Sequence, residues 1–547
     1  MASRYRWGGT GDINAFFGLT LDNIAGMVLA VSMLHEVFGF PAEFALRYMI
    51  PGTAIGVLVG DLLYFLLAFP LAKRTGGAVT AMPLGLDTPS TIGMVLFVLG
   101  PAFVRGKEQG LDATGAAMLA WHIGICAILW TGLIKLVLAC ASGWARRRLP
   151  RAGLLGSLAA IALVLIAFLP LLDVLAMPVV GLTSLAVILV TLVARGALPW
   201  RVPGAAGAVV LSVAVYYLLV GLSRATGSEL VPMATALFEP STGWLPAEWL
   251  QVFAFDWIGA WRESLRYLPY IIPFALTTVI GGIDCTESAA SVGDEYRTGT
   301  IIGVEAIATL AAAFCGGVIQ TTPYIGHPAY KAMGARALYT LLTALFVGGA
   351  GLIGYFGYLY LWIPKAALLP ILIFVGLEIT AQSYRATPRR HYAALAFACL
   401  PAAAKLVAIV VGAVLFDPAL IGQGIGLEQL SPKAQEQVGV VLTLAGGFIV
   451  TSLLWSSALA EIIDRRLVRG ALYFGICAVA TLFGVMHSGD DKMYLPWALS
   501  GKTLHTVLQF AAAYVVVAAI LGGLALLQRG RVQPLTADED FESLDAG

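Results

Sequence analysis

GGAVTAMPLGLDTP occupies residues 76–89, and GGVIQTTPYIGHP occupies residues 316–328. In both stretches a Gly-Gly pair is followed by five residues and then a proline, and the two prolines, Pro83 and Pro323, stand 240 residues apart. Glycine and proline disfavour a regular helix. Because each stretch opens an apolar run of helical length, the pattern predicts two membrane helices that are interrupted in the same way. Ordinary kinks in two continuous helices are the alternative.

The composition around these stretches is that of a polytopic membrane protein. Of 547 residues, 59% are apolar and 12% are charged, and the mean hydropathy is +0.86. Soluble domains carry about 45–50% apolar and about 25% charged residues. These figures exclude a multidomain soluble enzyme, a disordered chain and a disulfide-rich secreted scaffold. The net charge is only +1 and no basic patch occurs, so no nucleic-acid partner is expected.

The apolar runs predict sixteen spans, which agrees with room for roughly 16 helices of about 20 apolar residues each. They are residues 13–33, 46–72, 76–104, 113–140, 152–173, 178–195, 203–222, 266–291, 298–316, 317–335, 337–363, 367–384, 391–416, 438–463, 469–487 and 504–527.

Lysine and arginine concentrate in alternate connections between these spans. Examples are residues 146–151 after the fourth span and residues 465–469 after the fourteenth, whereas Arg105, Lys107 and Lys365 are exceptions. Basic loops stay on the cytoplasmic side. The alternation therefore predicts that all sixteen segments cross and that both termini are cytoplasmic. The N-terminus has no small-residue cleavage site after its first apolar run, so we expect it to be uncleaved. The expected location is a bacterial-type inner (plasma) membrane.

The two interrupted segments are the third and tenth spans, and each is the third element of a block of seven. Because seven is odd, the second block enters the membrane from the opposite side, as in the inverted repeats of many secondary transporters. The predicted fold is an all-α polytopic membrane protein with seven plus seven spans and two extra C-terminal helices. Its parts are a cytoplasmic N-terminus (1–12), a first repeat (13–222), an external connection (223–265), a second repeat (266–463), two additional helices (464–527) and a cytoplasmic tail (528–547).

Two connecting features complete the organisation. Residues 248–267, EWLQVFAFDWIGAWRESLRY, are amphipathic and rich in aromatic residues, which predicts a helix lying in the membrane interface. The six cysteines are scattered without metal-type spacing, so neither a disulfide nor a metal site is indicated. No cofactor is expected beyond a coupling ion, H⁺ or Na⁺.

The ends of the interrupted segments are candidates for a solute site. Asp87 precedes Thr88 and Pro89 and has the features of a helix N-cap, and His327 holds the matching position in the second copy. Two short helices would then direct their positive ends toward the membrane midplane. Such a site suits an anion or a ring rich in acceptors, and a bulky residue at Gly85 would block it. A purely structural histidine is the alternative for His327.

Carboxylates inside spans are costly and are functional candidates. The stretch TTVIGGIDCTESAASVGDEY (277–296) places Asp284 and Glu287 three residues apart, on one face of the eighth span. We expect Asp284 to bind the solute and Glu287 to carry the coupling ion. Asp22 is the counterpart in the first span and a second coupling candidate, with structural hydrogen bonding as the alternative.

Other charged residues in spans are expected to be structural or to belong to a coupling network. They are Asp61, Glu305, Glu378 and Lys405. Lys135 and Glu461 stand near predicted cytoplasmic ends, where we expect them to extend toward the interface.

Three segments resemble the xanthine/uracil permease family of nucleobase–cation symporters and nucleobase–ascorbate transporters, which includes the adenine/guanine/hypoxanthine permeases. They are TAMPLGLDTPSTIGM (80–94), GGVIQTTPYIGHPAY (316–330) and IPKAALLPILIFVGLEIT (363–380). The resemblance implies a core domain that moves like an elevator against a gate domain, and a possible homodimer. It also implies that the solute lies between the strand-like parts of the third and tenth spans, beside Asp284 or Glu287. The contacting residues there would be Gly85, Leu86, Asp87, Thr322, Tyr324 and His327.

The resulting hypothesis is a proton- or sodium-coupled importer of a nucleobase, acting on a small-molecule substrate in a lipid bilayer. The alternative is an anion transporter of the sulfate/bicarbonate permease type, which shares that fold. Site carboxylates disfavour a divalent anion. A membrane enzyme or receptor is a third class, but no HExxH, GxSxG or P-loop motif occurs, so no enzymatic activity is expected.

Overall fold

The computed structural model describes residues 5–199, 202–231, 244–324, 326–415, 426–489 and 493–528. These residues are mostly helical, and they contain one two-stranded sheet. The chain divides into two units, each described here by itself. Unit 1 comprises residues 1–146 and 166–378, and unit 2 comprises residues 147–165 and 379–547.

Unit 1 contains the sheet, formed by β1 (Leu84–Leu86) and β2 (Thr321–Pro323), and most of the helices. These helices are α1 (Gly11–Phe38), α2 (Ala42–Phe44), α3 (Ile50–Thr75), α4 (Thr88–Met94), α5 (Gly100–Glu108), α6 (Ala113–Arg148), α8 (Phe168–Ala176), α9 (Pro178–Ile188), α10 (Gly204–Thr226), α11 (Trp261–Ser264), α12 (Leu268–Ser291), α13 (Thr298–Phe314), α14 (His327–Ala332), α15 (Leu338–Ile353), α16 (Phe356–Trp362) and α17 (Lys365–Leu368). Turns of π-helix at Ala45–Met49, Val95–Leu99 and Leu189–Val193 continue α2, α4 and α9.

Unit 2 is built from long helices. They are α7 (Arg151–Ile161), the end of α18 (Pro370–Arg385), α19 (Tyr392–Leu415), α21 (Pro432–Ala445), α22 (Phe448–Ile463), α23 (Leu467–Leu482) and α24 (Gly501–Leu527). Small residues let α7 and α22 approach closely, because a Cβ added to Gly156 would come within 2.6 Å of the Ser456 hydroxyl. That hydroxyl donates to the Ala152 carbonyl over 2.6 Å. Close contact through glycine and serine is typical of helices that associate in lipid.

The helices confirm an integral membrane protein but not the count of sixteen crossings. Among the described residues, eight helices are long and apolar enough to span a membrane, or up to eleven if each bent pair is one span. The predicted span 337–363 bends by 90° between α15 and α16, and the predicted span 438–463 bends by 76° between α21 and α22. The seven-plus-seven repeat and the cytoplasmic termini therefore remain predictions.

The two glycine- and proline-rich stretches are not helical, and they pair with each other. β1 and β2 are antiparallel, with Gly85 opposite Thr322 at the centre. The pairing continues on both sides, because the Tyr324 N–H donates to the Pro83 carbonyl over 2.8 Å and the Asp87 N–H donates to the Gln320 carbonyl over 3.3 Å. A short helix follows each strand, α4 after β1 and α14 after β2.

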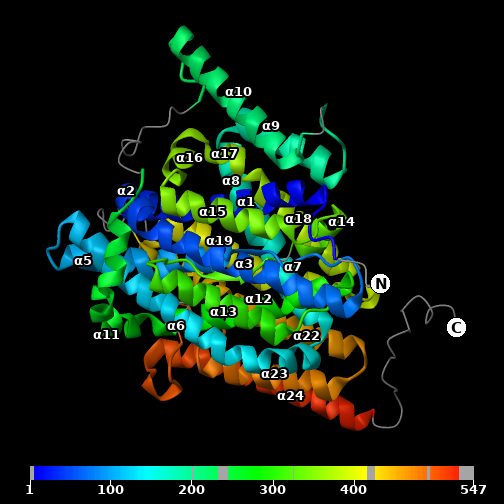
Figure 1. Cartoon of the computed structure of the whole chain (residues 1–547). Coiled ribbons are helices and arrows are strands. Elements are labelled where there is room, and N and C mark those ends of the chain that lie inside the picture. Colours follow the sequence, from blue (N-terminus) through cyan, green and yellow to red (C-terminus); the bar gives the residue numbers. More distant parts are fainter. Residues whose placement is uncertain are drawn as a thin grey trace. The chain divides into compact units, whose positions relative to one another are not determined.

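A row of glycines on one face of α3 allows α13 and the second extended stretch to pack closely against that helix. Gly52, Gly56 and Gly60 are four residues apart and therefore lie on one face of the helix. A Cβ added to them would lie 2.2 Å from the Cys315 carbonyl oxygen, 2.7 Å from the Ala312 methyl group and 2.4 Å from the Leu84 side chain, respectively. Figure 1 shows α3, in blue, running beside α13 and α15, in green, which come from distant parts of the sequence.

Aromatic side chains satisfy the exposed backbone of the first extended stretch. The hydroxyl groups of Tyr5, Tyr296 and Tyr339 donate to the carbonyls of residues 79, 80 and 81 over 2.6, 2.7 and 2.6 Å, respectively. On the second stretch, Trp121 Nε1 donates to the Gly316 carbonyl over 2.7 Å. Non-helical backbone at membrane depth requires such internal partners.

The amphipathic connection is a series of short turns rather than one continuous helix. Two 3₁₀ turns, Glu248–Ala254 and Asp256–Ala260, precede α11, and they meet at Phe255, whose φ is +60°. Trp249 and Trp257 are buried, whereas Phe253 and Phe255 are exposed. The segment thus anchors itself on tryptophans and leaves aromatic rings on its outer side.

Candidate functional site

The centre of the candidate site is the strand pair, where α1 and α3 each contribute a buried carboxylate. Asp61 Oδ1 accepts the Leu84 N–H over 3.0 Å. Asp22 lies against the middle of the strand, because a Cβ added to Gly85 would stand 3.4 Å from Asp22 Oδ2. Both carboxylates are buried. Glycine at position 85 therefore leaves the space that brings a charged group to the strand.

Tyr324 and Thr322 approach the same point from the second stretch. The Tyr324 ring would lie 3.3 Å from a Cβ at Gly85, so Asp22, Gly85 and Tyr324 come together from α1, β1 and the residue after β2. Thr322 is half-buried and Tyr324 is buried. Leu86 packs on α1, where a Cβ at Gly26 would meet its side chain at 3.5 Å.

Helix α12 closes the site from another side and carries the two predicted carboxylates. Asp284 and Glu287 are both buried. Cys285, the residue after Asp284, donates its thiol to the Pro323 carbonyl over 3.1 Å, so this part of α12 lies against β2. Helices α1 and α3 therefore each bring an acidic side chain to one short sheet, and α12, which carries two further buried carboxylates, contacts that sheet through Cys285.

The carboxylate of Asp87 caps its own helix. Its Oδ2 accepts the Ser90 N–H over 2.9 Å, as an N-cap residue does. The positive end of α4 is thus already covered by a carboxylate of the chain. This arrangement is the structural role that N-cap residues commonly fill.

His327 lies apart from the centre of the strand pair. The ring is fully buried, and Nε2 lies 3.1 Å from the Thr80 carbonyl and 3.2 Å from Asp294 Oδ2. Asp294 also pairs with Lys331, 2.7 Å away, and accepts the Thr80 N–H over 3.1 Å. Burial alone would raise the pKa of the Asp294 carboxyl, but hydrogen bonds and charge from His327 and Lys331 hold that pKa below its usual value.

Residues that occupy equivalent positions in the two stretches make equivalent contacts across the strand pair. The offset of 240 residues matches Thr80 with Gln320 and Asp87 with His327. In the structure the backbone of Asp87 meets that of Gln320, and the ring of His327 meets the carbonyl of Thr80. Asp87 thus contacts Gln320, and the equivalent residue His327 contacts Thr80. The first contact is made by a backbone N–H and the second by a side chain.

An ion pair that the sequence did not predict lies beside β2. Lys135 and Glu305 are fully buried, with Nζ 2.7 Å from Oε1. Nζ also donates to the Thr321 carbonyl over 2.9 Å. The expectation that Lys135 extends toward the interface is therefore wrong, because its ammonium finds both a carboxylate and a carbonyl inside unit 1. A lysine within an apolar run was the available signal, but its partner is 170 residues away in the sequence.

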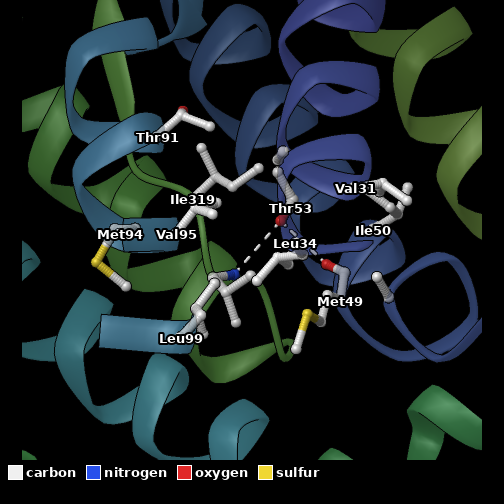
Figure 2. A pocket seen from close by; sticks show the side chains of 13 residues that line it. Val31, Leu34, Met49, Ile50, Thr53, Thr91, Met94, Val95, Leu99 and Ile319 are labelled. Carbon is white, nitrogen blue, oxygen red and sulfur yellow. Dashed lines mark hydrogen bonds between the residues drawn. The ribbon is translucent and has the colours of Figure 1, made fainter. Parts of the chain in front are cut away.

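A small apolar pocket lies next to the site. It is lined by α1, α3, the α4 segment and residues 318–319, with Leu34, Ile50 and Leu99 among its side chains (Figure 2). The Thr53 hydroxyl donates to the Met49 carbonyl over 3.0 Å and accepts the Val318 N–H over 3.4 Å, which satisfies the polar group in its wall. The pocket therefore offers contacts to an apolar group rather than to a charge.

The overall charge of the site is negative. The buried carboxylates of unit 1 among the described residues include Asp22, Asp61, Asp284, Glu287 and Glu305, and the only buried lysine or arginine there is Lys135. Two unit charges 4 Å apart interact by about 4 kcal/mol at an effective dielectric constant of 20. The site in its fully ionised form therefore attracts protons and other cations and repels anions.

Comparison with known proteins yields neither a family nor a close relative. No protein-family model matches the chain, and no curated protein matches it. Among solved structures, the transmembrane domain of a cyanobacterium bicarbonate transporter, BicA, is 14% identical, with a TM-score of 0.42, and the match covers 82% of this chain and 97% of that one. SLC26A9 is 15% identical, with a TM-score of 0.40, and the match covers 74% of this chain and 65% of that one.

The predicted membership of the xanthine/uracil permease family is wrong. The solved structures found include a bicarbonate transporter and SLC26A9, and no family model supports the permease assignment. The motifs that suggested it, at residues 80–94 and 316–330, share glycines and prolines that lie in and around the extended backbone of β1 and β2. The core and gate domains and the elevator motion were implications of that resemblance and lose their support with it.

Proposed function

We propose that this chain is a secondary active transporter that carries a small anion across a membrane together with protons. The observation that carries the proposal is a set of buried carboxylates inside a helical membrane protein. Asp22 and Asp61 lie at a pair of short strands, and Asp284 and Glu287 lie on α12, which contacts β2. Interrupted helices at membrane depth are tolerated where they are buried in protein or line a cavity, and transporters bind their solutes at such places.

The carboxylates make proton coupling a requirement for an anionic solute. An anion beside ionised Asp22, Asp284 and Glu287 would be repelled by several kcal/mol per close charge. Protonation removes that repulsion and turns each carboxyl group into a hydrogen-bond donor for the anion. In this scheme Asp284 contacts the solute, and Glu287 and Asp22 take up the protons that accompany it.

The residues at the strand pair provide further donors. Thr322 and Tyr324 carry hydroxyl groups on and just after β2, and Gly85 leaves room in front of them. Small oxyanions have many acceptor lone pairs and little surface, so a few donors in a narrow space suit them. The bicarbonate transporter among the similar structures makes bicarbonate the first solute to test.

The proposal is tested by flux into proteoliposomes that contain the purified protein. Labelled bicarbonate, sulfate and small carboxylates are offered separately, with and without an inward proton gradient. We expect one of these anions to accumulate only when the gradient is present, and Asp284→Asn to abolish that uptake without loss of folded protein. The matched control is Glu295→Gln, because Glu295 is exposed in the loop that follows α12.

Three outcomes would contradict the proposal. Gradient-driven uptake of an uncharged solute in place of every anion would refute the solute class. Anion uptake that is indifferent to the proton gradient would refute the coupling. Full uptake by Asp284→Asn would show that the solute binds elsewhere.

A further inference from the structure

The lysine of the buried ion pair lies at the strand that belongs to the candidate site. The side chains of Lys135 and Glu305 are both 0% exposed. The ammonium lies 2.7 Å from Glu305 Oε1 and 2.9 Å from the carbonyl of Thr321, the first residue of β2. The charge of Lys135 also interacts with Asp87, so it acts on both interrupted segments.

The helices that carry the pair pack closely on both sides of it. On one side of the pair, a Cβ added to Gly132 of α6 would stand 2.7 Å from the Leu310 side chain of α13. On the other side, a Cβ added to Gly299 of α13 would stand 3.0 Å from the Ala139 carbonyl of α6. The two helices therefore touch above and below Lys135, and its ammonium is held where it is by close packing.

The groups around the ammonium are those that a small hard cation requires. Such cations take oxygen ligands from carboxylates, backbone carbonyls and hydroxyl groups. Glu305 supplies a carboxylate and Thr321 a carbonyl. The Thr309 hydroxyl adjoins them, 3.4 Å from the Thr321 carbonyl oxygen and 3.2 Å from the Thr321 hydroxyl oxygen. On the other side, Gly282 leaves room for Glu305 Oε2, because a Cβ there would come within 2.9 Å of it.

We infer that the Lys135 ammonium takes the place of a coupling cation: it is a tethered cation that neutralises Glu305 beside β2, and its removal opens a binding site for Na⁺ there. The native chain then has no use for Na⁺ and depends on protons. The statement that protons rather than Na⁺ drive transport rests on the proposed function. The cation site itself is testable without transport.

The test measures the melting temperature of the purified, detergent-solubilised protein in NaCl, KCl and choline chloride of equal ionic strength. The variants are Lys135→Ala, Lys135→Gln and the double variant Lys135→Ala/Glu305→Gln. Lys365→Ala is the matched control, because Lys365 also pairs with a carboxylate, that of Glu36 at 2.6 Å, but both side chains are partly exposed.

We expect the native chain, the Lys365→Ala control and the double variant to melt at the same temperature in all three salts. Lys135→Ala is expected to melt higher in NaCl than in choline chloride. Binding to the native state stabilises it by mass action, so Na⁺ at ten times its dissociation constant should raise the melting temperature by about 2–5 °C. KCl should have a smaller effect.

Several results would overturn the inference. A Lys135→Ala protein that folds and is indifferent to Na⁺ would show that the lysine is only structural. A Na⁺ effect on the native chain would show that a cation site exists beside the lysine. Failure of both single variants to fold in NaCl as well as in choline chloride also overturns it, because Na⁺ must be able to replace the ammonium. If Na⁺ stabilises Lys135→Ala while the native chain carries no solute, the proposed function fails and the cation site stands.

Discussion

Replacing Gly52 by alanine tests the packing that positions the second extended stretch. A Cβ at this position would lie 2.2 Å from both the Cys315 carbonyl oxygen and the Gly317 nitrogen. Ordinary contact begins at 3.4 Å, so α3 and residues 315–317 would have to separate by 1.2 Å. The atoms in the way belong to the backbone, and no side-chain rotation can relieve the contact.

The cost of this separation is estimated from measured overpacking in protein interiors. Extra methylene groups in a packed core cost about 1–3 kcal/mol, and a clash with backbone lies at the upper end of that range. One kcal/mol corresponds to about 2–4 °C in melting temperature for a domain of 150–250 residues. We therefore expect Gly52→Ala to melt roughly 5 °C or more below the native chain.

Two further glycines give a graded comparison. At Gly56 the nearest atom to the added Cβ would be the Ala312 methyl group, at 2.7 Å, and the nearest backbone atom would be the Ala308 carbonyl oxygen, at 3.2 Å, so a smaller loss is expected. At Gly303, on α13, an added Cβ would meet nothing within 4 Å. Alanine there reduces the entropy of the unfolded chain and should leave the protein as stable or slightly more stable.

The assay is the thermal unfolding of the three purified variants in one detergent, followed by a thiol-independent probe. The reasoning predicts the order Gly52→Ala, Gly56→Ala, native chain, Gly303→Ala from least to most stable. A Gly52→Ala protein as stable as the native chain would refute the close approach of α3 to residues 315–317. Equal losses in all three variants would show that helix flexibility, not packing, decides the outcome.

Three other predictions follow from the site. The folded-state pKa of Asp294 is depressed, so its carboxylate stabilises the fold at neutral pH and loses this effect only as the pH falls below the ordinary aspartate pKa of about 4 and through the lower folded-state pKa. Asp294→Asn should therefore melt lower than the native chain at pH 7, and a difference in melting temperature that does not shrink in acid contradicts this. Tyr339→Phe leaves the buried Ala81 carbonyl without its 2.6 Å donor and should cost about 1–3 kcal/mol in thermal unfolding, whereas Tyr217→Phe, at an exposed hydrogen bond, should cost less than about 0.5 kcal/mol. Gly85→Val should reduce flux in proteoliposomes at least tenfold while the protein stays folded, and normal flux would place the solute away from β1.

The interrupted segments were predictable because their cause is local. The Gly-Gly pairs and the prolines that follow them at residues 76–89 and 316–328 together disfavour a regular helix through their own backbone properties. The N-cap role of Asp87 was predictable for the same reason, since a cap depends on its nearest neighbours in the sequence. The pairing of the two stretches as strands is consistent with the repeat, but its register depends on contacts across more than two hundred residues.

The partners of the charged residues could not be predicted because they lie on different helices. Lys135 is paired with Glu305 only because Gly132 and Gly299 allow α6 and α13 to touch. In the same way His327 meets Asp294 through the loop after α12, which the offset between the two stretches does not specify. Sequence reasoning identified Glu305 as a charged residue within a span and His327 as a candidate site residue, but it could not find which charged residue pairs with each of them.

Carboxylates inside unit 1 fall into two groups, those with an identified partner in the structure and those that could exchange a proton. Glu305 has a cation of its own in Lys135, and the Asp87 carboxylate caps its own helix, so each has an identified partner inside unit 1. Asp22 and Asp61 are buried beside the strands, and Lys135 is the only buried lysine or arginine among the described residues of unit 1, so these two carboxylates have no buried lysine or arginine of their own. Burial of several ionised carboxylates without counter-charges is very costly. That cost is lowered by protonation, and a solute whose binding depends on those protons would be coupled to their movement.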